Sequence, residues 1–335
     1  MSSELNEIVN FIITVLVFPG LLFTLIASFL TQWYYRKLYA HMQNRVGPRF
    51  IGPFGLLQPI ADFLKLLFKE DITTIVARKK EQALLLSLGA GACMALLAML
   101  PFSPYPIAGD YDVIIALYLT LWPTIALVLV GMMAPNPFTI IGTSRYLSLM
   151  LIYEPLWAVT LIVPVVLVSR ACPIHPIYSL YTTSLFSWAF WRSPTGIIAL
   201  ALGLITSILV LQCKLMLKPF DIPEAETEIV AGMFTEYSGP KLAYIVLLHD
   251  LEIVVYSILI TYLYLGGPAP FPLLSVEGIL TFIVKYALIV LVLTMIKAAT
   301  ARFRIEQAMI VMLKYAIPMG IASILIASLA PITFW

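Results

Sequence analysis

Charge is scarce in this sequence, and its scarcity decides the class of protein. Only 11% of the 335 residues are charged, whereas 61% are hydrophobic, and the mean hydropathy is +0.98. Soluble domains usually carry about 25% charged residues. Apolar runs of about 20 residues, the length of a bilayer-spanning helix, recur along the chain. The composition excludes an ordinary soluble domain and predicts an all-α, polytopic membrane protein that forms a single integral membrane domain over residues 1–335.

Residues that bind metals or nucleotides are also few. The three cysteines (Cys93, Cys172 and Cys213) are far apart, and no pair has the spacing of a zinc or iron–sulfur ligand set. The chain has no glycine-rich phosphate loop and no HExxH pattern. Its start lacks basic residues and carries Glu4 and Glu7, so we expect a first span rather than a signal peptide. We therefore expect no metal, redox centre or nucleotide on this chain.

Eight apolar segments are predicted to span the membrane, with ends uncertain by a few residues. They are residues 8–32, 82–101, 112–134, 144–169, 195–217, 241–265, 276–298 and 308–332. Residues 171–191 are also almost uncharged, but this stretch is short, interrupted by proline and rich in Trp and Tyr, which favour the membrane interface. We expect an interfacial loop there, and a ninth span is the alternative.

Basic residues predict the orientation of these spans. Most Lys and Arg residues fall on one side of the predicted topology, in loops 33–81, 135–143, 214–240 and 297–307 and at their edges, and only Arg170 and Arg192 fall on the other side. Because basic loops stay in the cytoplasm, we expect a plasma-membrane protein whose basic loops are cytoplasmic and whose termini are both outside. Loops 33–81, 214–240 and 297–307 are then available to bind cytoplasmic partners.

The first basic loop contains a predicted amphipathic helix at about residues 53–69. Gln58, Asp62, Lys65 and Lys69 form a narrow polar stripe at helical spacing, and apolar residues cover the remaining surface. Such a helix lies at the membrane surface. It acts either as a membrane anchor or as the wall of an internal chamber.

The second basic loop holds an unusual concentration of acid. Residues 218–239 (KPFDIPEAETEIVAGMFTEYSG) contain five carboxylates: Asp221, Glu224, Glu226, Glu228 and Glu236. We expect a short helix within residues 221–236, with Asp221 as its N-cap and Pro223 and Glu224 in its first turn. Apolar neighbours indicate limited contact with water, which raises carboxylate pKa values. The segment is either a solvated, well-capped loop or part of a proton relay.

Ionisable residues inside predicted spans are costly and are functional candidates. Glu154 lies ten residues into its span, and His249, Asp250 and Glu252 lie about as deep in theirs, roughly 13–17 Å at 1.5 Å per residue. Lys285 and Lys314 lie in the last two spans. The acids and bases form either a proton path or static ion pairs between spans. The third loop, at 301–315, adds Arg302 and Arg304 as membrane anchors or docking charges.

Three motifs resemble the H subunit of respiratory complex I, called chain 1 in mitochondria, and its relatives. They are QNRVGPRFIGPFGLLQPIADFLKLLFKED at 43–71, the acidic motif at 218–239, and ARFRIEQAMIVMLKYAIP at 301–318. The resemblance covers most of the chain in order. Two further stretches, NPFTIIGTSRYLSLMLIYEP at 136–155 and SGPKLA at 238–243, are similar to energy-converting hydrogenases. The mixture resembles the membrane anchors of the archaeal membrane-bound hydrogenase and the related sulfane reductase.

This resemblance implies a non-catalytic subunit that couples redox chemistry in a cytoplasmic arm to ion translocation. It implies that the acids named above, with His249, Lys285 and Lys314, are proton-path candidates. It also implies that one set of residues lines the chamber or docks the arm: Arg45, Arg49, Gln58, Asp62, Lys65, Arg145, Arg302 and Arg304. At two positions the chain departs from complex I members: Tyr35 stands before Arg36-Lys37 where they usually have Glu, and His249, followed by Asp250, occupies the place of their span-six Glu.

The partners implied are hydrophilic iron–sulfur and large redox subunits, antiporter-like membrane subunits and the lipid bilayer, without nucleic acid. Iron–sulfur clusters, and in a hydrogenase a nickel–iron centre, would lie in those partners and not in this chain. The expected function is ion coupling in a ferredoxin-linked complex that reduces protons or sulfur. The alternative is the quinone-chamber subunit of a complex I-type quinone oxidoreductase. Two further alternatives are an independent secondary transporter, whose paired broken spans the sequence lacks, and a pure scaffold.

Overall fold

The eight predicted spans are confirmed as eight long apolar helices. A computed structural model describes residues 13–74, 77–103, 109–134, 136–171, 178–273 and 275–330, and all regular structure in these ranges is helical. The spanning helices are α2 (Leu21–Met42), α4 (Lys79–Ala98), α5 (Asp112–Met132), α6 (Pro137–Ala171), α8 (Pro194–Lys214), α10 (Gly239–Leu265), α11 (Val276–Ala299), and α12 (Ile305–Val311) continued through the π-helical turn η4 (Met312–Ala316) into α13 (Ile317–Leu329). Two predicted spans are described only in part: the first residues of the span at 8–32 and the last residues of the span at 308–332 lie outside the described residues.

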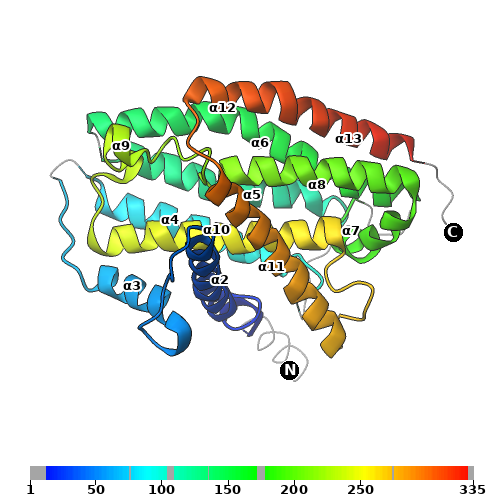
Figure 1. Cartoon of the computed structure of the whole chain (residues 1–335), viewed down its shortest axis with the longest axis horizontal. Coiled ribbons are helices and arrows are strands. Elements are labelled where there is room, and N and C mark those ends of the chain that lie inside the picture. Colours follow the sequence, from blue (N-terminus) through cyan, green and yellow to red (C-terminus); the bar gives the residue numbers. More distant parts are fainter. Residues whose placement is uncertain are drawn as a thin grey trace, which may run out of the picture.

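Helix α10 is the centre of the bundle. It is the most buried of the spanning helices, and it packs against α2, α4 and α11 as well as the short helix α3. Helices α6, α8 and α13 pack together along one side, while α2 and α11 cross the other (Figure 1). Because α10 touches elements from both halves of the sequence, polar groups on its different faces lie in different environments.

Two spans are longer than the sequence predicted. Helix α2 continues to Met42, so Tyr35, Arg36 and Lys37 are helical, and the expected start of the first loop at residue 33 is wrong. Helix α6 has 35 residues, which at 1.5 Å per residue is about 52 Å, against about 30 Å for the hydrocarbon core. The added turns of α2 carry Arg36 and Lys37, whereas the residues added at the start of α6, 137–143, are mostly apolar and pack on residues 232–234.

The alternative of a ninth span within residues 171–191 is wrong for the residues that the structure describes, whereas the interfacial position of this stretch stays a prediction; residues 172–177 lie outside the described ranges. The chain forms a two-turn helix α7 (Leu180–Phe186) and the 3₁₀ turn η2 (Ser187–Arg192), both too short to span a bilayer. The buried carboxylate of Asp112 accepts hydrogen bonds from Ser179 Oγ and Leu180 N, both at 2.6 Å. This carboxylate fixes the start of α7 against α5.

The amphipathic helix is present but shorter than expected. It divides into the 3₁₀ turn η1 (Pro53–Gly55) and helix α3 (Gln58–Leu67), which packs against α2 and α10. Gln58 donates to Asp62 at 2.9 Å, and Arg36 of α2 donates to the same carboxylate at 2.5 Å. Lys65 and Lys69 are exposed. The polar stripe therefore faces α2 at one end and solvent at the other.

The predicted capping of the acidic loop is wrong. Residues 221–225 are not helical, and the helical pieces are α9 (Glu226–Ile229) and the turn η3 (Gly232–Phe234). Asp221 accepts a 2.7 Å ion pair from Arg302 instead of capping a helix. The loop packs tightly on α6, since a Cβ added to Gly142 would lie 2.6 Å from the Met233 nitrogen. Tertiary contacts outweigh the local capping preference here.

Candidate functional site

Three of the five acids in the 221–236 segment are held by separate partners. Asp221 pairs with Arg302, Glu228 pairs with Arg145 at 2.6 Å, and Glu236 accepts a hydrogen bond from Asn136. Glu226 is exposed. Sequence reasoning expected one pooled cluster, but the structure spreads the carboxylates along α6 and the 297–307 loop.

Glu224 differs from its neighbours because its side chain turns into the protein. Burial raises the pKa of Glu224 to about 7, and the nearby Asp221 carboxylate acts in the same direction, while Lys297 and Arg302 oppose the change. A carboxyl group with this pKa exchanges a proton near neutral pH. Of the acids in this segment, Glu224 is therefore the best suited to proton transfer.

A polar cavity of about 250 Å³ lies between α2, α10 and α11, close to Glu224. Its lining includes Gln32, Arg36, His249, Asp250 and Lys297. Asp250 is 8% exposed and faces this cavity, and His249 Nε2 lies 2.8 Å from the Leu215 carbonyl. The structure thus places the predicted residues His249 and Asp250 in one cavity with Gln32, Arg36 and Lys297. The sequence analysis did not connect these three residues with them.

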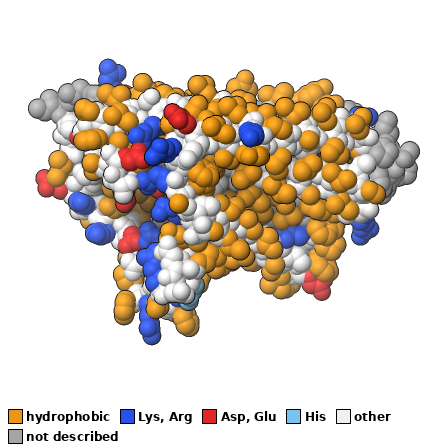
Figure 2. Space-filling model, turned by 45° about the horizontal axis from the view of Figure 1, so that its top comes forward, with side chains coloured by type: hydrophobic (Ala, Val, Ile, Leu, Met, Phe, Trp, Pro, Cys, Tyr) orange, Lys and Arg blue, Asp and Glu red, His pale blue; other side chains and the backbone are white. Residues whose placement is uncertain are grey.

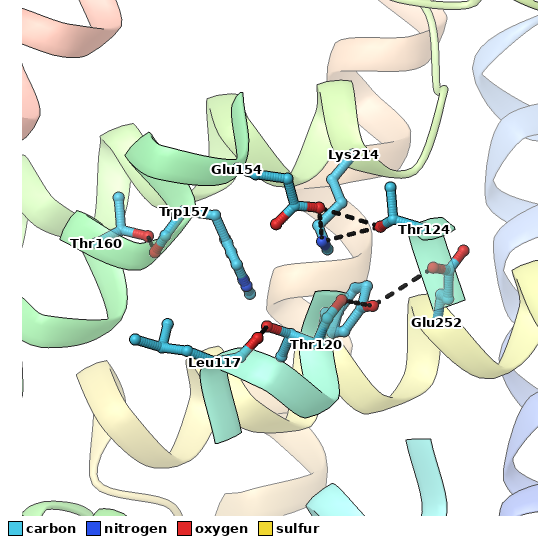
Figure 3. A network of polar contacts seen from close by, with 9 residues as sticks. Leu117, Thr120, Thr124, Glu154, Trp157, Thr160, Lys214 and Glu252 are labelled. Atoms are coloured by element: carbon cyan, nitrogen blue, oxygen red, sulfur yellow. Dashed lines mark hydrogen bonds and ion pairs between the residues drawn. The ribbon is translucent and has the colours of Figure 1, made fainter. Parts of the chain in front are cut away.

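A second polar group, the buried centre, lies on the other side of α10. It consists of Thr124 on α5, Glu154 on α6, Lys214 on α8, and Glu252 and Tyr256 on α10. The Lys214 ammonium forms an ion pair with Glu154 Oε1 and donates to Thr124 Oγ1 at 3.1 Å, and Thr124 donates to Glu154 at 3.1 Å. Figure 3 shows these side chains directed at one another, with Glu252 beyond Thr124. Four helices therefore supply a single charged centre.

Lys214 is the residue that sequence reasoning missed. It was placed in a cytoplasmic loop, but its side chain is fully buried. Helix α8 ends at Lys214, and the chain continues through Leu215, Met216 and Leu217, which are also buried. The end of α8 consequently lies inside the protein, where its C-terminal dipole favours a cation. The apolar run after Lys214 was the available signal.

Aromatic rings enclose the Lys214 ammonium. Its Nζ lies 5.5 Å from the Tyr153 ring centroid, 6.0 Å from that of Trp157 and 5.3 Å from that of Tyr256. Tyr256 also donates a long, 3.4 Å hydrogen bond to Glu252 Oε1. Cation–π contacts of this kind stabilise a cation away from water. Lys214 and Glu252 therefore share one neighbour without a direct contact.

Glu252 is the least satisfied member of the buried centre. It is fully buried, and its Oε2 atom has no hydrogen-bond partner among the described residues. Burying a polar oxygen without a hydrogen-bond donor is costly. Lys214 and Thr124 satisfy Glu154, whereas Glu252 has only the long contact with Tyr256.

Glu154 connects the buried centre to the surface of the bundle. A groove of about 300 Å³ between α5 and α6 is lined by apolar residues and by Glu154, whose side chain is 14% exposed. One carboxylate oxygen binds Lys214 and Thr124, which leaves the group open on its other side. Of the two buried carboxylates, Glu154 is the accessible one.

A larger cavity of about 750 Å³ lies between α2, α3, α4 and α10. Its lining is almost entirely apolar and includes Leu25, Phe63, Leu84, Met94 and Leu248. Cavities of this volume and character accommodate small apolar molecules or hydrocarbon chains. The predicted chamber-wall residues Gln58, Asp62 and Lys65 belong to α3, but they do not line this cavity.

The remaining predicted charges lie away from both polar groups. Lys285 donates to the carbonyls of Leu265, Gly267 and Ala269 at 2.6, 3.0 and 2.5 Å, and Trp188 covers its ammonium at 4.1 Å. These contacts occupy the ammonium and tie α11 to the end of α10.

Lys314, in η4, is exposed on the outer surface, and so are Arg45 and Arg49. In the parts of the chain that the structure describes, no three His, Cys, Asp or Glu side chains gather as a metal site.

Comparison with known proteins agrees with this geometry. The family model described as NADH dehydrogenase matches residues 13–328. The H subunit of NADH-quinone oxidoreductase from Campylobacter concisus is 31% identical over 340 residues, which cover 97% of this chain and 99% of that protein. The chain belongs to the family of complex I H subunits. As a member of that family with eight apolar helices, it is a multi-pass membrane component of a complex I-type assembly, and the other subunits of that assembly are its partners.

Proposed function

We propose that this chain couples ion translocation to electron transfer in a ferredoxin-linked complex of the membrane-bound hydrogenase or sulfane reductase type. The observation that carries the coupling role is the ion pair between Lys214 and Glu154, with the unpartnered Glu252 beside it. Charged groups inside a membrane bundle are expensive, and they are retained chiefly where ions or protons move. The chain itself would hold no redox centre, and iron–sulfur or nickel–iron chemistry would take place in partner subunits.

Two polar groups in series support the coupling role. The polar cavity with Asp250 lies beside the acidic segment, and the buried centre lies across α10 from it. Asp250 and Glu252 are two residues apart on one helix, so their side chains project in nearly opposite directions, about 160° apart. A change of charge at the acidic segment would act first on Glu224 and the polar cavity, and then through α10 on Glu252, Lys214 and Glu154.

The ferredoxin-linked type is supported by sequence and by the character of the polar cavity. The 136–155 and 238–243 stretches are similar to energy-converting hydrogenases. The polar cavity is small, and Arg36, Lys297 and Asp250 on its wall suit water and ions better than an apolar ring. A complex of this kind would reduce protons or sulfur on its cytoplasmic arm.

The arrangement of charge supports cytoplasmic docking. Figure 2 shows most of the charged side chains of the visible face gathered toward its left end, and apolar side chains over most of the rest of that face. In this proposal that end is cytoplasmic, both termini are outside, and loops 33–81, 214–240 and 297–307 contact the hydrophilic arm. The exposed Arg45 and Arg49 would meet the arm first.

The test is ferredoxin-driven ion transport by the whole complex in proteoliposomes. We expect the double variant Glu154→Gln/Glu228→Gln to lose ion transport while ferredoxin oxidation continues. Glu277→Gln, an exposed acid at the first turn of α11, is the matched control and should pump normally. Full pumping by the double variant would exclude the coupling role.

A quinone-chamber subunit is the second candidate, and the 750 Å³ apolar cavity favours it. The relative from Campylobacter concisus is named as part of a quinone oxidoreductase. If quinone occupied the cavity, a labelled quinone-site inhibitor would bind the purified complex, and Ala90→Leu on the cavity wall would weaken that binding. Absence of inhibitor binding, together with ferredoxin-driven pumping, would favour the first candidate.

A further inference from the structure

A small basic cavity, separate from both polar groups, lies where α12 meets α6 and the acidic segment. It has a volume of about 230 Å³. Three arginines line it, Arg145, Arg302 and Arg304, together with Glu228 and apolar side chains that include Phe303. Arginine binds the oxygens of carboxylate and phosphate groups with planar pairs of N–H donors. The lining therefore indicates a site for an oxyanion.

Two of the three arginines that line this basic cavity form ion pairs with described residues, and the third does not. Arg145 pairs with Glu228 at 2.6 Å, and Arg302 pairs with Asp221 at 2.7 Å. Arg304 is exposed and makes no ion pair with any described residue. In addition, the buried Nε–H of Arg302 has no acceptor among the described residues. A group with one negative charge and several oxygens would balance the charge and supply that acceptor.

The position of the basic cavity indicates where such a group comes from. Helix α12 begins at Ile305, directly after Arg304, and carries the exposed apolar residue Ile310, and the exposed Leu313 follows in η4. Arg145 lies eight residues after the start of α6, whose exposed residues include the apolar Ile140 and Ile141. The basic cavity therefore adjoins exposed apolar side chains of α6, α12 and η4, which can hold acyl chains.

We propose that the basic cavity binds the phosphate group of an anionic phospholipid. A phosphodiester carries one negative charge, which matches the one guanidinium without an ion pair. Basic pockets between spanning helices commonly bind such head groups. A carboxylate of a partner protein offers similar chemistry, but it would not use the apolar surface of α12. The bound lipid would tie the acidic segment, through Arg302 and Asp221, to the membrane beside it.

The experiment compares lipid binding by the purified complex in nanodiscs of phosphatidylglycerol and of phosphatidylcholine. Retained lipid is measured by mass spectrometry after detergent washing. We expect the native complex to retain phosphatidylglycerol selectively, and Arg304→Gln to weaken retention about tenfold, the effect of losing one charge-assisted hydrogen bond. Arg78→Gln, an exposed arginine outside the cavity, is the matched control and should retain lipid normally.

Further arms separate the other sources of an oxyanion. Inorganic phosphate at millimolar concentration should not displace the lipid; displacement would indicate a site for free phosphate and overturn the proposal. A photo-crosslinking residue at position 304 should label lipid, with or without labelling of the hydrophilic arm, and labelling of a partner protein alone would likewise overturn the proposal. Equal retention by the native complex and Arg304→Gln would show that the arginines bind no head group. Because Arg304 makes no ion pair with any described residue, loss of folding does not obscure these results.

Discussion

The Lys214–Glu154 pair permits a quantitative test of how the buried centre is held together. In Lys214→Met the Glu154 carboxylate loses its cation, and Thr124 Oγ1 becomes its only described donor. Removal of one partner from a buried ion pair costs about 3–5 kcal/mol, because the other charge is left uncompensated. At about 2 °C per kcal/mol for a large chain, thermal unfolding should move down by about 6–10 °C.

The double variant Lys214→Met/Glu154→Gln should recover much of that loss. It carries no net buried charge at this position, and Thr124 can still hydrogen-bond the amide. We expect the double-mutant cycle to give a coupling energy of about 2–3 kcal/mol, near the upper end for contacting residues. The assay heats the purified complex and measures unfolding as the loss of this chain from the complex.

The control for this cycle is Cys213→Ala, which changes the adjacent buried side chain without touching the ion pair. Purely additive effects in the cycle would show that Lys214 and Glu154 do not depend on each other. Native stability of Lys214→Met alone would show that Glu154 is already neutral. Either result would refute the description of the buried centre as an ion pair.

Three other predictions concern groups outside this pair. Folding raises the pKa of Glu224 to about 7, so the folded state binds more protons than the unfolded state, and stability should fall as pH rises from about 5 to 8. Thermal unfolding measured between these pH values checks this, and Glu224→Gln should flatten the dependence. Lys285→Met should lower stability by about 3 kcal/mol, because three carbonyls lose their donor. The ratio of translocated ions to transferred electrons should stay unchanged, and a changed ratio would return Lys285 to the proton path. Lys285→Arg is the control. Asp112→Ala should cost about 2–4 kcal/mol and increase hydrogen exchange in α7, because two hydrogen bonds to its carboxylate are lost. Unchanged exchange there would mean that other contacts fix this helix. Glu277→Ala, at an exposed acid in the first turn of α11, is the control.

Much of the fold follows from composition alone. Apolar runs long enough to cross a bilayer leave the chain no alternative to helices, since an unpaired backbone cannot be tolerated in lipid. For that reason the number of spans could be predicted, and residues 178–191 form no further span. Prediction failed at the helix ends, because α2 and α6 extend beyond their predicted spans onto other protein segments, and hydropathy does not report such contacts.

The same distinction holds for the candidate site, where the sequence identifies residues but not their contacts. Glu154, Asp250 and Glu252 could be selected from the sequence because an acid in an apolar run is conspicuous. Their grouping could not, because a linear sequence does not state which face of α10 meets which neighbour. Asp250 and Glu252 belong to different polar groups although only one residue separates them.

What the sequence by itself determined was the class of protein, the eight helices and the positions of the buried acids, because the cost of placing charge and open backbone in lipid depends on composition and length. What only the tertiary structure decided was the set of partners: that α8 ends inside the bundle, that Lys214 is therefore a buried counterion and not a loop residue, and that Asp221, Glu228 and Glu236 have three different partners. Partners are set by packing between helices, and packing depends on distances in space that the order of residues does not contain.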